Sequence, residues 1–237
     1  MYRAEFPGTP RAVEIVCKQG ARRGRWSQFL GRWWKSRARR EFEAALALNR
    51  CGISTARPVA LLQHGESGTE FVISEFVTDA RDLDQVALRL LPSMGATPAR
   101  ALKHALIDGL ADMIASLERH RFGHRDFKAS NILAQNCGKP QDARVVLVDL
   151  EGVQIGAGTR IGGFPGAGQA VRLAASLIGY PHVSRSDAGR LMRAYLRSSS
   201  RSAKHWKAWT RSLLIEAEKY NAQAQARKRG KLDGYSG

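Results

Sequence analysis

The chain reads His124-Arg125-Asp126-Phe127-Lys128-Ala129-Ser130-Asn131 near its middle, and a later apolar run, Val145-Val146-Leu147-Val148, ends at Asp149. In enzymes that transfer the γ-phosphoryl group of Mg·ATP, a loop of the form H-R-D-x-x-x-x-N is followed by an Asp just after a downstream strand. These two segments, in this order, decide the fold that the sequence predicts and indicate its class of chemistry.

The spacing within the loop has a chemical reason. Asp126 is predicted to accept the proton of an incoming hydroxyl, while Asn131 and Asp149 are predicted to bind the same Mg²⁺. Lys128 follows Asp126 closely, so its ammonium group is predicted to reach the phosphoryl group during transfer. Taken singly, H-R-D could be a chance tripeptide and Asp149 a turn residue, but their order favours the catalytic interpretation.

A catalytic loop of this kind requires a lysine on an early strand, paired with a glutamate on the next helix, to orient the phosphates of ATP. Residues 11–18 alternate as a strand, which puts Val16 and Lys18 on one face, where Val16 would cover the adenine and Lys18 would bind the phosphates. Residues 39–48 favour a helix in which Glu41 is the predicted partner of Lys18, with Glu43 as second candidate. Without the loop, these would be ordinary surface charges.

Residues 71–77 predict a buried strand that leads into a hinge, where backbone groups near Glu75 and Val77 would meet the adenine edge. A strand that serves only the core would look the same. Residues 101–117 predict an amphipathic helix that leads into the catalytic loop. The chain is therefore predicted to be one α+β domain with a two-lobed protein-kinase-like fold, divided into a small sheet lobe (residues 1–79) and a larger, mainly helical lobe (residues 80–237).

Further passages carry a resemblance to a known family. They are Arg40-Glu41-Phe42, Cys51-Gly52-Ile53-Ser54-Thr55-Ala56-Arg57-Pro58-Val59-Ala60, Arg125-Asp126-Phe127, Val148-Asp149-Leu150 and residues 183–196. In these the chain resembles the lipopolysaccharide core kinases, the Kdo/heptose kinase family, from about residue 13 to residue 200. The resemblance implies the phosphate, structural, base and metal roles for Lys18, Glu41, Asp126, Asn131 and Asp149. It also implies ATP and Mg²⁺ as cofactors and a sugar hydroxyl of a lipopolysaccharide or glycolipid core as acceptor.

Some passages depart from kinase patterns. Asp149-Leu150-Glu151-Gly152 is not the Asp-Phe-Gly of eukaryotic protein kinases, and no Ala-Pro-Glu follows, which argues against a regulated protein kinase. Only residues 1–17 precede Lys18, which is too few for the two strands and the glycine-rich loop that precede this lysine in kinases. One strand is expected in residues 1–6. The chain is expected either to lack the first strand and the phosphate-covering loop or to start at an internal methionine. A catalytically weak or silent pseudokinase is therefore an alternative. The glycine-rich residues 156–168 match no nucleotide motif and are expected to form a flexible segment.

The net charge of +17 attracts anions such as ATP, nucleic acid or an acidic membrane face. Residues 22–40 combine eight arginines and lysines with Trp26, Trp33 and Trp34, as expected at lipid headgroups, on single-stranded nucleic acid, or in a basic loop that covers the next helix. Of these three interpretations the basic loop is favoured first, an anionic membrane surface second and nucleic acid last. An aminoglycoside-type phosphotransferase is a further alternative, but its cationic acceptors would need an acidic pocket.

Cysteines and termini complete the predictions. Cys17, Cys51 and Cys137 are scattered, as in reduced cytosolic proteins. The sequence contains neither a secretion signal nor a run of 18 apolar residues, so a cytoplasmic protein is expected, peripheral on the inner face of the cytoplasmic membrane. A helix is predicted over residues 203–224, followed by a disordered basic tail at residues 227–231. His124 is expected to brace the catalytic loop rather than to transfer protons.

Overall fold

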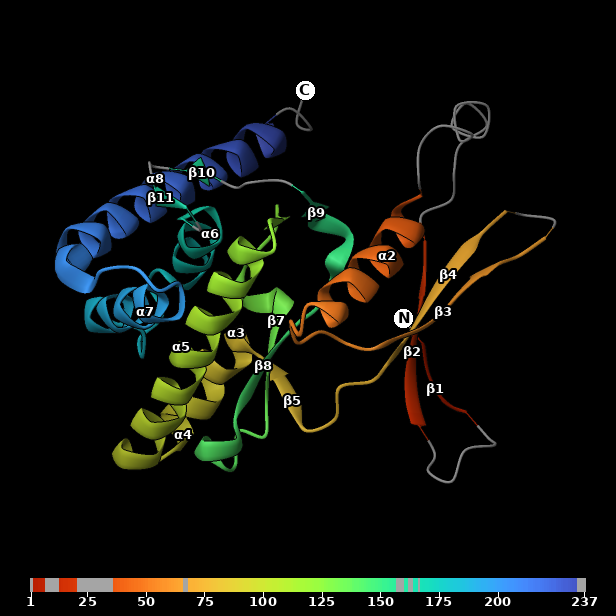
Figure 1. The fold of residues 1–237 in the computed structure, drawn as a ribbon, viewed down its shortest axis with the longest axis horizontal. Coiled ribbons are helices and arrows are strands. Elements are labelled where there is room, and N and C mark those ends of the chain that lie inside the picture. The colour runs from red at the N-terminus through yellow and green to blue at the C-terminus, as the bar shows by residue number, and fades with distance from the viewer. Residues whose placement is uncertain are drawn as a thin grey trace.

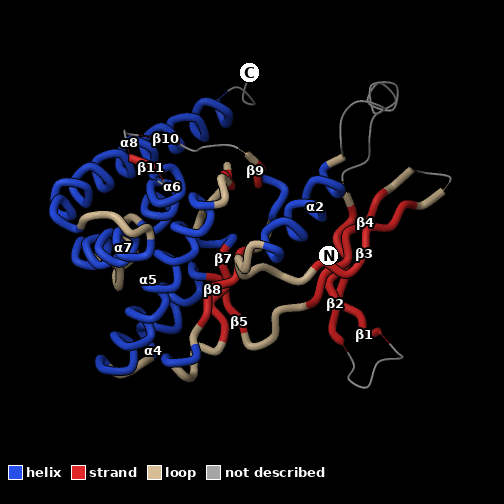
Figure 2. Tube along the Cα trace, in the orientation of Figure 1, coloured by secondary structure: helices blue, strands red, loops and turns tan. Residues whose placement is uncertain are grey.

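The structure is a computed structural model, and it describes residues 2–6, 13–20, 36–65, 68–156, 160–161, 164–165 and 167–233. Figure 1 shows two parts. The first, at the right, is a small sheet with the helix α2 packed on it, and the second, at the left, is larger and mainly helical. Figure 2 shows most strands in the small part or where the two parts meet, while the short β10 and β11 lie among the helices beside α8. This arrangement agrees with the predicted two-lobed α+β fold.

The small lobe is built on four antiparallel strands in the order β1-β2-β4-β3. Within it, β1 (Tyr2–Phe6) is the strand expected in residues 1–6, and β2 (Val13–Gln19) covers the described part of the strand predicted at residues 11–18 and extends one residue beyond it. Its partner β4 (Glu70–Glu75) pairs in turn with β3 (Pro58–Gln63). The β2–β4 register sets Lys18 opposite Val72, near the centre of the sheet.

One helix, α2 (Arg37–Arg50), covers this sheet and extends the predicted helix at both ends. It begins at Ser36, whose hydroxyl accepts a hydrogen bond from the Arg39 amide at 3.0 Å. Its buried face carries Ala44, Ala45 and Leu48, and the small alanines let the backbone approach the strands. The helix ends before Gly52, whose φ of +70° turns the chain back. This packing fixes Glu41 on the side that faces β2.

The chain enters the large lobe through β5 (Ala80–Asp82), α3 (Leu83–Gln85), the π-helical turn η1 (Val86–Leu90) and α4 (Leu91–Ser93). The long helix α5 (Ala96–Arg119) follows, and its apolar stripe runs through the core of this lobe. It is longer than predicted at both ends and leads, as expected, into the segment that contains Asp126.

That segment lies among short strands. It runs from β6 (Phe122–His124) through the 3-10 turn η2 (Ala129–Asn131) into β7 (Ile132–Gln135). The chain then passes through η3 (Pro140–Asp142), β8 (Arg144–Leu147), η4 (Leu150–Gly152) and β9 (Val153–Ile155). Antiparallel pairing sets Ile132 opposite Leu147, and the Val148 amide donates to the Asn131 carbonyl at 2.9 Å. This register brings the end of the catalytic loop next to Asp149.

The remaining elements complete the helical lobe. In the glycine-rich segment, β10 (Arg160–Ile161) pairs with β11 (Phe164–Pro165). They are followed by α6 (Ala167–Leu177), α7 (Arg185–Ser198), the 3-10 turn η5 (Ala203–His205) and α8 (Trp206–Asp233). The helix predicted over residues 203–224 therefore starts with a 3-10 turn, and the prediction of a disordered tail was wrong, because α8 continues through residues 227–231. The basic, tryptophan-rich residues 22–35 lie outside the described residues.

Candidate active site

Lys18, Glu41 and Asp149 come from three distant parts of the chain and meet at one point. The Lys18 Nζ lies 3.0 Å from Glu41 Oε2 and 2.8 Å from Asp149 Oδ1. Lys18 thus links the sheet to α2 and both to the end of β8. Glu43, the second candidate, instead pairs with Arg39 on its own helix at 3.2 Å. The structure brings Lys18 together with Glu41, as the sequence predicted.

Burial and charge act against each other in this cluster. Burial alone would lower the pKa of Lys18, but its hydrogen bond to Asp149 and the charge of Glu41 raise the pKa above its ordinary value. Burial raises the pKa of Glu41, although Lys18 opposes the shift. Lys18 is therefore fully cationic at neutral pH, and it is the group that makes two nearby carboxylates tolerable.

Asp149 has an unusual backbone. Its φ of 55° lies in the left-handed region, which costs a non-glycine residue on the order of 1 kcal/mol or more. The conformation turns the chain sharply from β8 into η4, where Glu151 pairs with Arg37 of α2 at 3.1 Å. Such strain is typical of positions whose side chain must point in one direction.

The predicted loop residues also lie together. The Asn131 Nδ2 donates to the Asp126 carbonyl at 2.9 Å and to Asp126 Oδ2 at 3.2 Å, and Lys128 Nζ lies 2.7 Å from the same Oδ2. The side chains of Asp126 and Lys128 are 53% and 42% exposed, so they can be reached from solvent. Asn131 thus connects Asp126 with the Asp149 end of β8.

His124 supports this loop from inside the core. Its Nδ1 accepts a hydrogen bond from the Asp126 amide at 3.1 Å, and its ring meets Phe127 edge-on. Gly152 lies against the ring, because a Cβ there would come within 3.3 Å of it. Burial lowers the pKa of His124 to about 4, so the imidazole is neutral at physiological pH. These contacts agree with the bracing role expected for His124.

A cavity of about 560 Å³ opens between the two lobes beside these groups. The predicted residues Val16, Lys18, Glu41, Glu75, Val77, Asn131 and Asp149 all line it. Asp126 and Lys128 are joined to it through Asn131. The cavity therefore connects the hinge with the catalytic loop.

Two backbone amides at the predicted hinge form hydrogen bonds within the small lobe. The Glu75 amide donates to the Arg57 carbonyl at 2.8 Å, and the Phe76 amide donates to the Glu14 carbonyl at 2.8 Å. The Glu75 side chain pairs with Arg57 at 3.0 Å. Both amides are thus engaged within the small lobe, while Glu75 and Val77 line the cavity, and contact of their other backbone groups with adenine stays a prediction.

Sequence reasoning missed the role of the segment after α2, which lines the cavity with Thr55, Ala56 and Pro58. The Thr55 hydroxyl donates to the Leu147 carbonyl at 2.7 Å, and the Leu147 amide donates to the Ser54 carbonyl at 2.9 Å. These bonds fasten the small lobe to β8 just before Asp149. The Gly-Ile-x-Thr-x-x-Pro passage was the available signal, but its spacing alone does not reveal this contact.

Within the described ranges, no three His, Cys, Asp or Glu side chains gather as a metal site. Asp149 and the Asn131 amide are nevertheless oxygen donors of the type that Mg²⁺ prefers, and Mg²⁺ commonly takes its other ligands from phosphates and water. The residues present therefore fit a nucleotide-bound Mg²⁺. Among the described residues, no helix has the length and apolar character needed to cross a membrane.

Comparisons with known proteins agree with this geometry. The model of the lipopolysaccharide kinase (Kdo/WaaP) family matches residues 19–160, more than half of the chain. A solved structure, "WaaP in complex with acyl carrier protein", superposes with a TM-score of 0.58 at 21% identity, over 92% of this chain and 84% of that chain. At this identity the likeness establishes the fold alone, and it confirms the kinase-like architecture. No curated protein sequence matches the chain significantly.

Proposed function

The chain belongs to the lipopolysaccharide kinase (Kdo/WaaP) family, and on that premise we propose that it transfers the γ-phosphoryl group of Mg·ATP to a hydroxyl of a lipopolysaccharide core sugar. As a member of a kinase family, it is an enzyme. One observation carries the finer proposal: Lys18 holds Glu41 and Asp149 at the wall of a cavity that reaches Asn131. The catalytic loop and both lobes thus converge on one point.

The cavity is the proposed nucleotide site. Val16 and Val77 would contact the adenine, and Lys18 would give up part of its contact with Asp149 to bind the phosphates. Glu41 would keep Lys18 in place, since its carboxylate has no nearer cation among the described ion pairs. We take the boundary of the lobes to lie at residues 79–80, directly after this hinge.

Asn131 and Asp149 are the proposed metal ligands. When bound, Mg²⁺ supplies the charge neutralisation that phosphoryl transfer needs. The strained backbone of Asp149 would fix its carboxylate, and the hydrogen bond between Val148 and Asn131 would hold the two ligands near each other. Positioning of this kind is the main contribution that a protein makes to this reaction.

Asp126 is the proposed general base. Lys128 and Asn131 both contact its Oδ2, so Oδ1 is the oxygen proposed to accept the proton of the acceptor hydroxyl. As the new O–P bond forms, Lys128 would be near the transferring phosphoryl group. Neutral His124 would hold the loop through the Asp126 amide without taking the proton.

The acceptor proposal rests on the family and on charge. A chain with a net charge of +17 suits an acceptor that carries phosphate or carboxylate groups, and does not suit a cationic aminoglycoside. The acceptor is lipid-anchored, so we place the enzyme on the cytoplasmic face of a membrane, where ATP is available. A silent pseudokinase is the rival, and only turnover separates the two.

A second binding function is proposed from an apolar cavity of about 290 Å³ among α5, α6, α7 and α8, whose walls include Leu106, Leu110, Leu173 and Leu213. The related WaaP structure is a complex with acyl carrier protein. An acyl chain delivered by such a protein would suit this cavity. Ala174→Phe, which fills it, should weaken binding of acylated carrier protein about tenfold or more and leave the unacylated form unaffected.

The kinase proposal is tested by transfer of γ-labelled phosphate from Mg·ATP to purified core glycolipid. Asp126→Asn should lower turnover by about 10²–10⁴ because it removes the base. Asp142→Asn, an equal charge change on exposed η3, should match the parent. Turnover of Asp126→Asn equal to the parent would remove Asp126 from this role, and a folded parent that transfers no label would favour the pseudokinase.

A further inference from the structure

The C-terminal helices carry an unbalanced charge. Between Arg185 and Arg211 the chain has eight arginines and lysines and a single carboxylate, Asp187. That carboxylate is buried and pairs with Lys103 of α5 at 3.0 Å. The cations of this segment therefore receive almost no compensation from their own part of the chain.

Five of these cations are exposed and lie in the second half of α7, in η5 and in the first two turns of α8, which leaves out Arg185 at the start of α7; we call this set the α7–α8 basic face. Arg190 and Arg201 are excluded from it because they pair with Asp108 and Glu118 of α5. The members are exposed, and none pairs with a carboxylate in the part of the chain that the structure describes. They are Arg193 and Arg197 of α7, Lys204 of η5, and Lys207 and Arg211 of α8.

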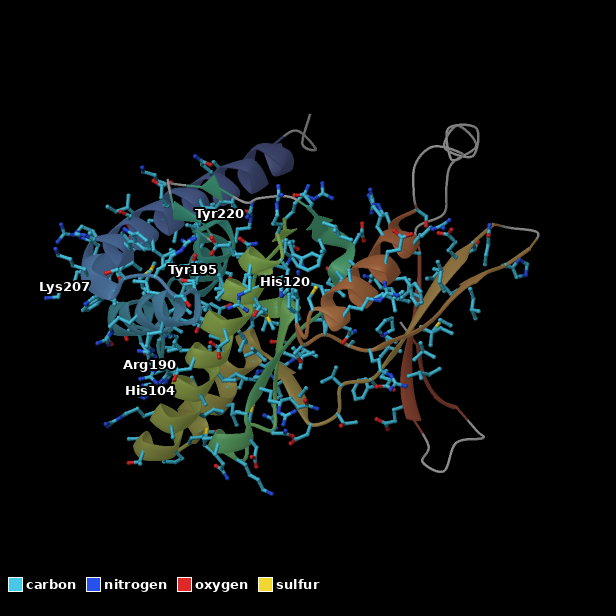
Figure 3. All side chains as sticks on the ribbon, viewed as in Figure 1. His104, His120, Arg190, Tyr195, Lys207 and Tyr220 are labelled. Atoms are coloured by element: carbon cyan, nitrogen blue, oxygen red, sulfur yellow. The ribbon has the colours of Figure 1, made fainter. Side chains whose placement is uncertain are left out.

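Trp206 joins the two helices of this face. Its ring fits against Gly189, where a Cβ would come within 3.1 Å of it. The Arg193 guanidinium lies 4.7 Å from the ring centroid and the Lys207 ammonium 5.8 Å from it. Figure 3 shows Lys207 at the edge of the helical lobe that is farthest from the sheet lobe, so the face leaves the nucleotide cavity open.

Apart from the contacts of Arg193 and Lys207 with the Trp206 ring, the folded chain gains nothing from this charge arrangement. Arg193 and Arg197 lie one helical turn apart, as do Lys207 and Arg211, and like charges at this spacing destabilise a helix. The first turn of α8 has no acidic residue, and Lys207 lies there against the positive end of the helix dipole. The benefit of these cations is therefore expected from an anionic partner.

We infer that the α7–α8 basic face binds a membrane surface rich in anionic phospholipid. The inference rests on the proposed function, because a lipid-anchored acceptor puts a membrane beside the enzyme. Each lysine or arginine near such a surface strengthens partition by about fivefold. Single-stranded nucleic acid fits less well, since the Trp206 ring already contacts Gly189, Arg193 and Lys207 and is not free to stack on a base.

The test is co-sedimentation of the full chain with vesicles of phosphatidylcholine, alone or mixed equally with phosphatidylglycerol. The variant Arg197→Gln/Lys204→Gln/Arg211→Gln removes three cations that do not touch Trp206, so the helix packing stays intact. The matched control, Arg81→Gln/Lys139→Gln/Arg144→Gln, removes three exposed cations around β5 and β8. The face variant should partition onto the mixed vesicles on the order of 10²-fold more weakly, and the control about as well as the parent.

The outcomes separate this inference from the kinase proposal, because sedimentation needs no turnover. Equal losses in both triple variants would show an effect of net charge alone and overturn the inference. Failure of the parent protein to bind the mixed vesicles at low salt would also overturn the inference. The inference also fails if the face variant still binds vesicles but no longer binds acyl carrier protein or nucleic acid. Loss of vesicle binding by the face variant alone would support it, whether or not the parent phosphorylates a glycolipid.

Discussion

In each of two clusters of this molecule, a cation pairs with at least one carboxylate group, and the surroundings of the two clusters differ. In the first, Lys18 contacts Glu41 and Asp149 at the wall of the large cavity. In the second, Arg201 pairs with Glu118 of α5 at 2.6 Å. The Tyr195 hydroxyl donates to the same carboxylate, and the Arg201 guanidinium lies over the Tyr195 ring.

The second cluster is saturated by protein groups, whereas the first faces open space. In the second, burial raises the pKa of the Tyr195 hydroxyl, and the hydrogen bond to Glu118 adds to the shift, so the donor keeps its proton. In the first, the Lys18 and Asp149 side chains are 37% and 45% exposed, and Asp149 has a strained backbone. Similar residue types thus hold helices together in one place and line an open cavity in the other.

The largest expected effect comes from Lys18→Met, which tests the first cluster. If Lys18 binds the phosphates, kcat/KM for ATP should fall on the order of 10³-fold, as when one charge-stabilising donor is removed. Stability should fall by no more than about 2 kcal/mol, because Glu41 loses its counter-charge while water in the cavity hydrates the more exposed Asp149. Steady-state kinetics and urea unfolding measure both, with Lys219→Met on exposed α8 as the control. If the activity of Lys18→Met stayed within tenfold of the parent, the first cluster would have a structural role, like the second.

His124, which accepts a hydrogen bond from the Asp126 amide, makes the stability of the fold depend on pH. Its folded pKa of about 4 lies below its ordinary value of 6.5, so the unfolded chain binds the proton more readily. The resulting stability is fully present above about pH 6.5 and is lost as pH falls towards 4, by about 3 kcal/mol. Urea unfolding across this range should show a smaller loss for His124→Asn than for the parent. The control His205→Asn should keep the parent's slope, and equal slopes in all three would refute the assignment.

Glu118→Gln tests the second cluster. It should lower stability and leave turnover per folded molecule unchanged, whereas Lys18→Met should chiefly lower activity. The neutral amide leaves Arg201 partly buried without its counter-charge, so unfolding free energy should fall by about 2 kcal/mol. Turnover per folded molecule should stay at the parent level. Glu216→Gln, which disrupts an exposed pair with Lys219, should change stability by less than about 0.5 kcal/mol. A Glu118→Gln protein that is stable but inactive would mean that the second cluster is also functional.

Local patterns in the sequence indicated the pair of Lys18 and Glu41 in the first cluster, but not the contact between Lys18 and Asp149. Strand alternation put Lys18 on one face with Val16, helical periodicity favoured Glu41 over Glu43, and the loop spacing linked Asp126 to Asn131. The antiparallel register of β7 and β8 then brings Asn131 and Asp149 together. Each step depends on residues that are close in sequence, or on a motif of fixed spacing.

The second cluster and several other features depend on how distant elements meet, and no local pattern reveals that. Nothing near Arg201 indicates that Glu118 faces it, and the bond between Thr55 and Leu147 joins residues from different lobes. The hydrogen bond from the Phe76 amide to the Glu14 carbonyl likewise depends on how β2 and β4 align, which no local pattern reveals. The extension of α8 through a charged segment was likewise missed, because charge density was read as disorder.

The smallest expected effect, and the finest test of the comparison, is Glu41→Gln against Glu43→Gln. Glutamine keeps a hydrogen bond to Lys18 but loses the charge, so kcat/KM for ATP should fall roughly tenfold. Glu43 pairs with Arg39 at the surface, so Glu43→Gln should stay within about twofold of the parent.

A pH profile sharpens this test, since burial raises the pKa of Glu41. Parent activity should decline on the acid side as Glu41 takes up a proton and its hold on Lys18 weakens, and the Glu41→Gln profile should lack that decline. If Glu43→Gln lost as much activity as Glu41→Gln, the position of a carboxylate on α2 would not matter. The first cluster would then act only through its net charge. It would differ from the second cluster only in the solvent exposure of its side chains.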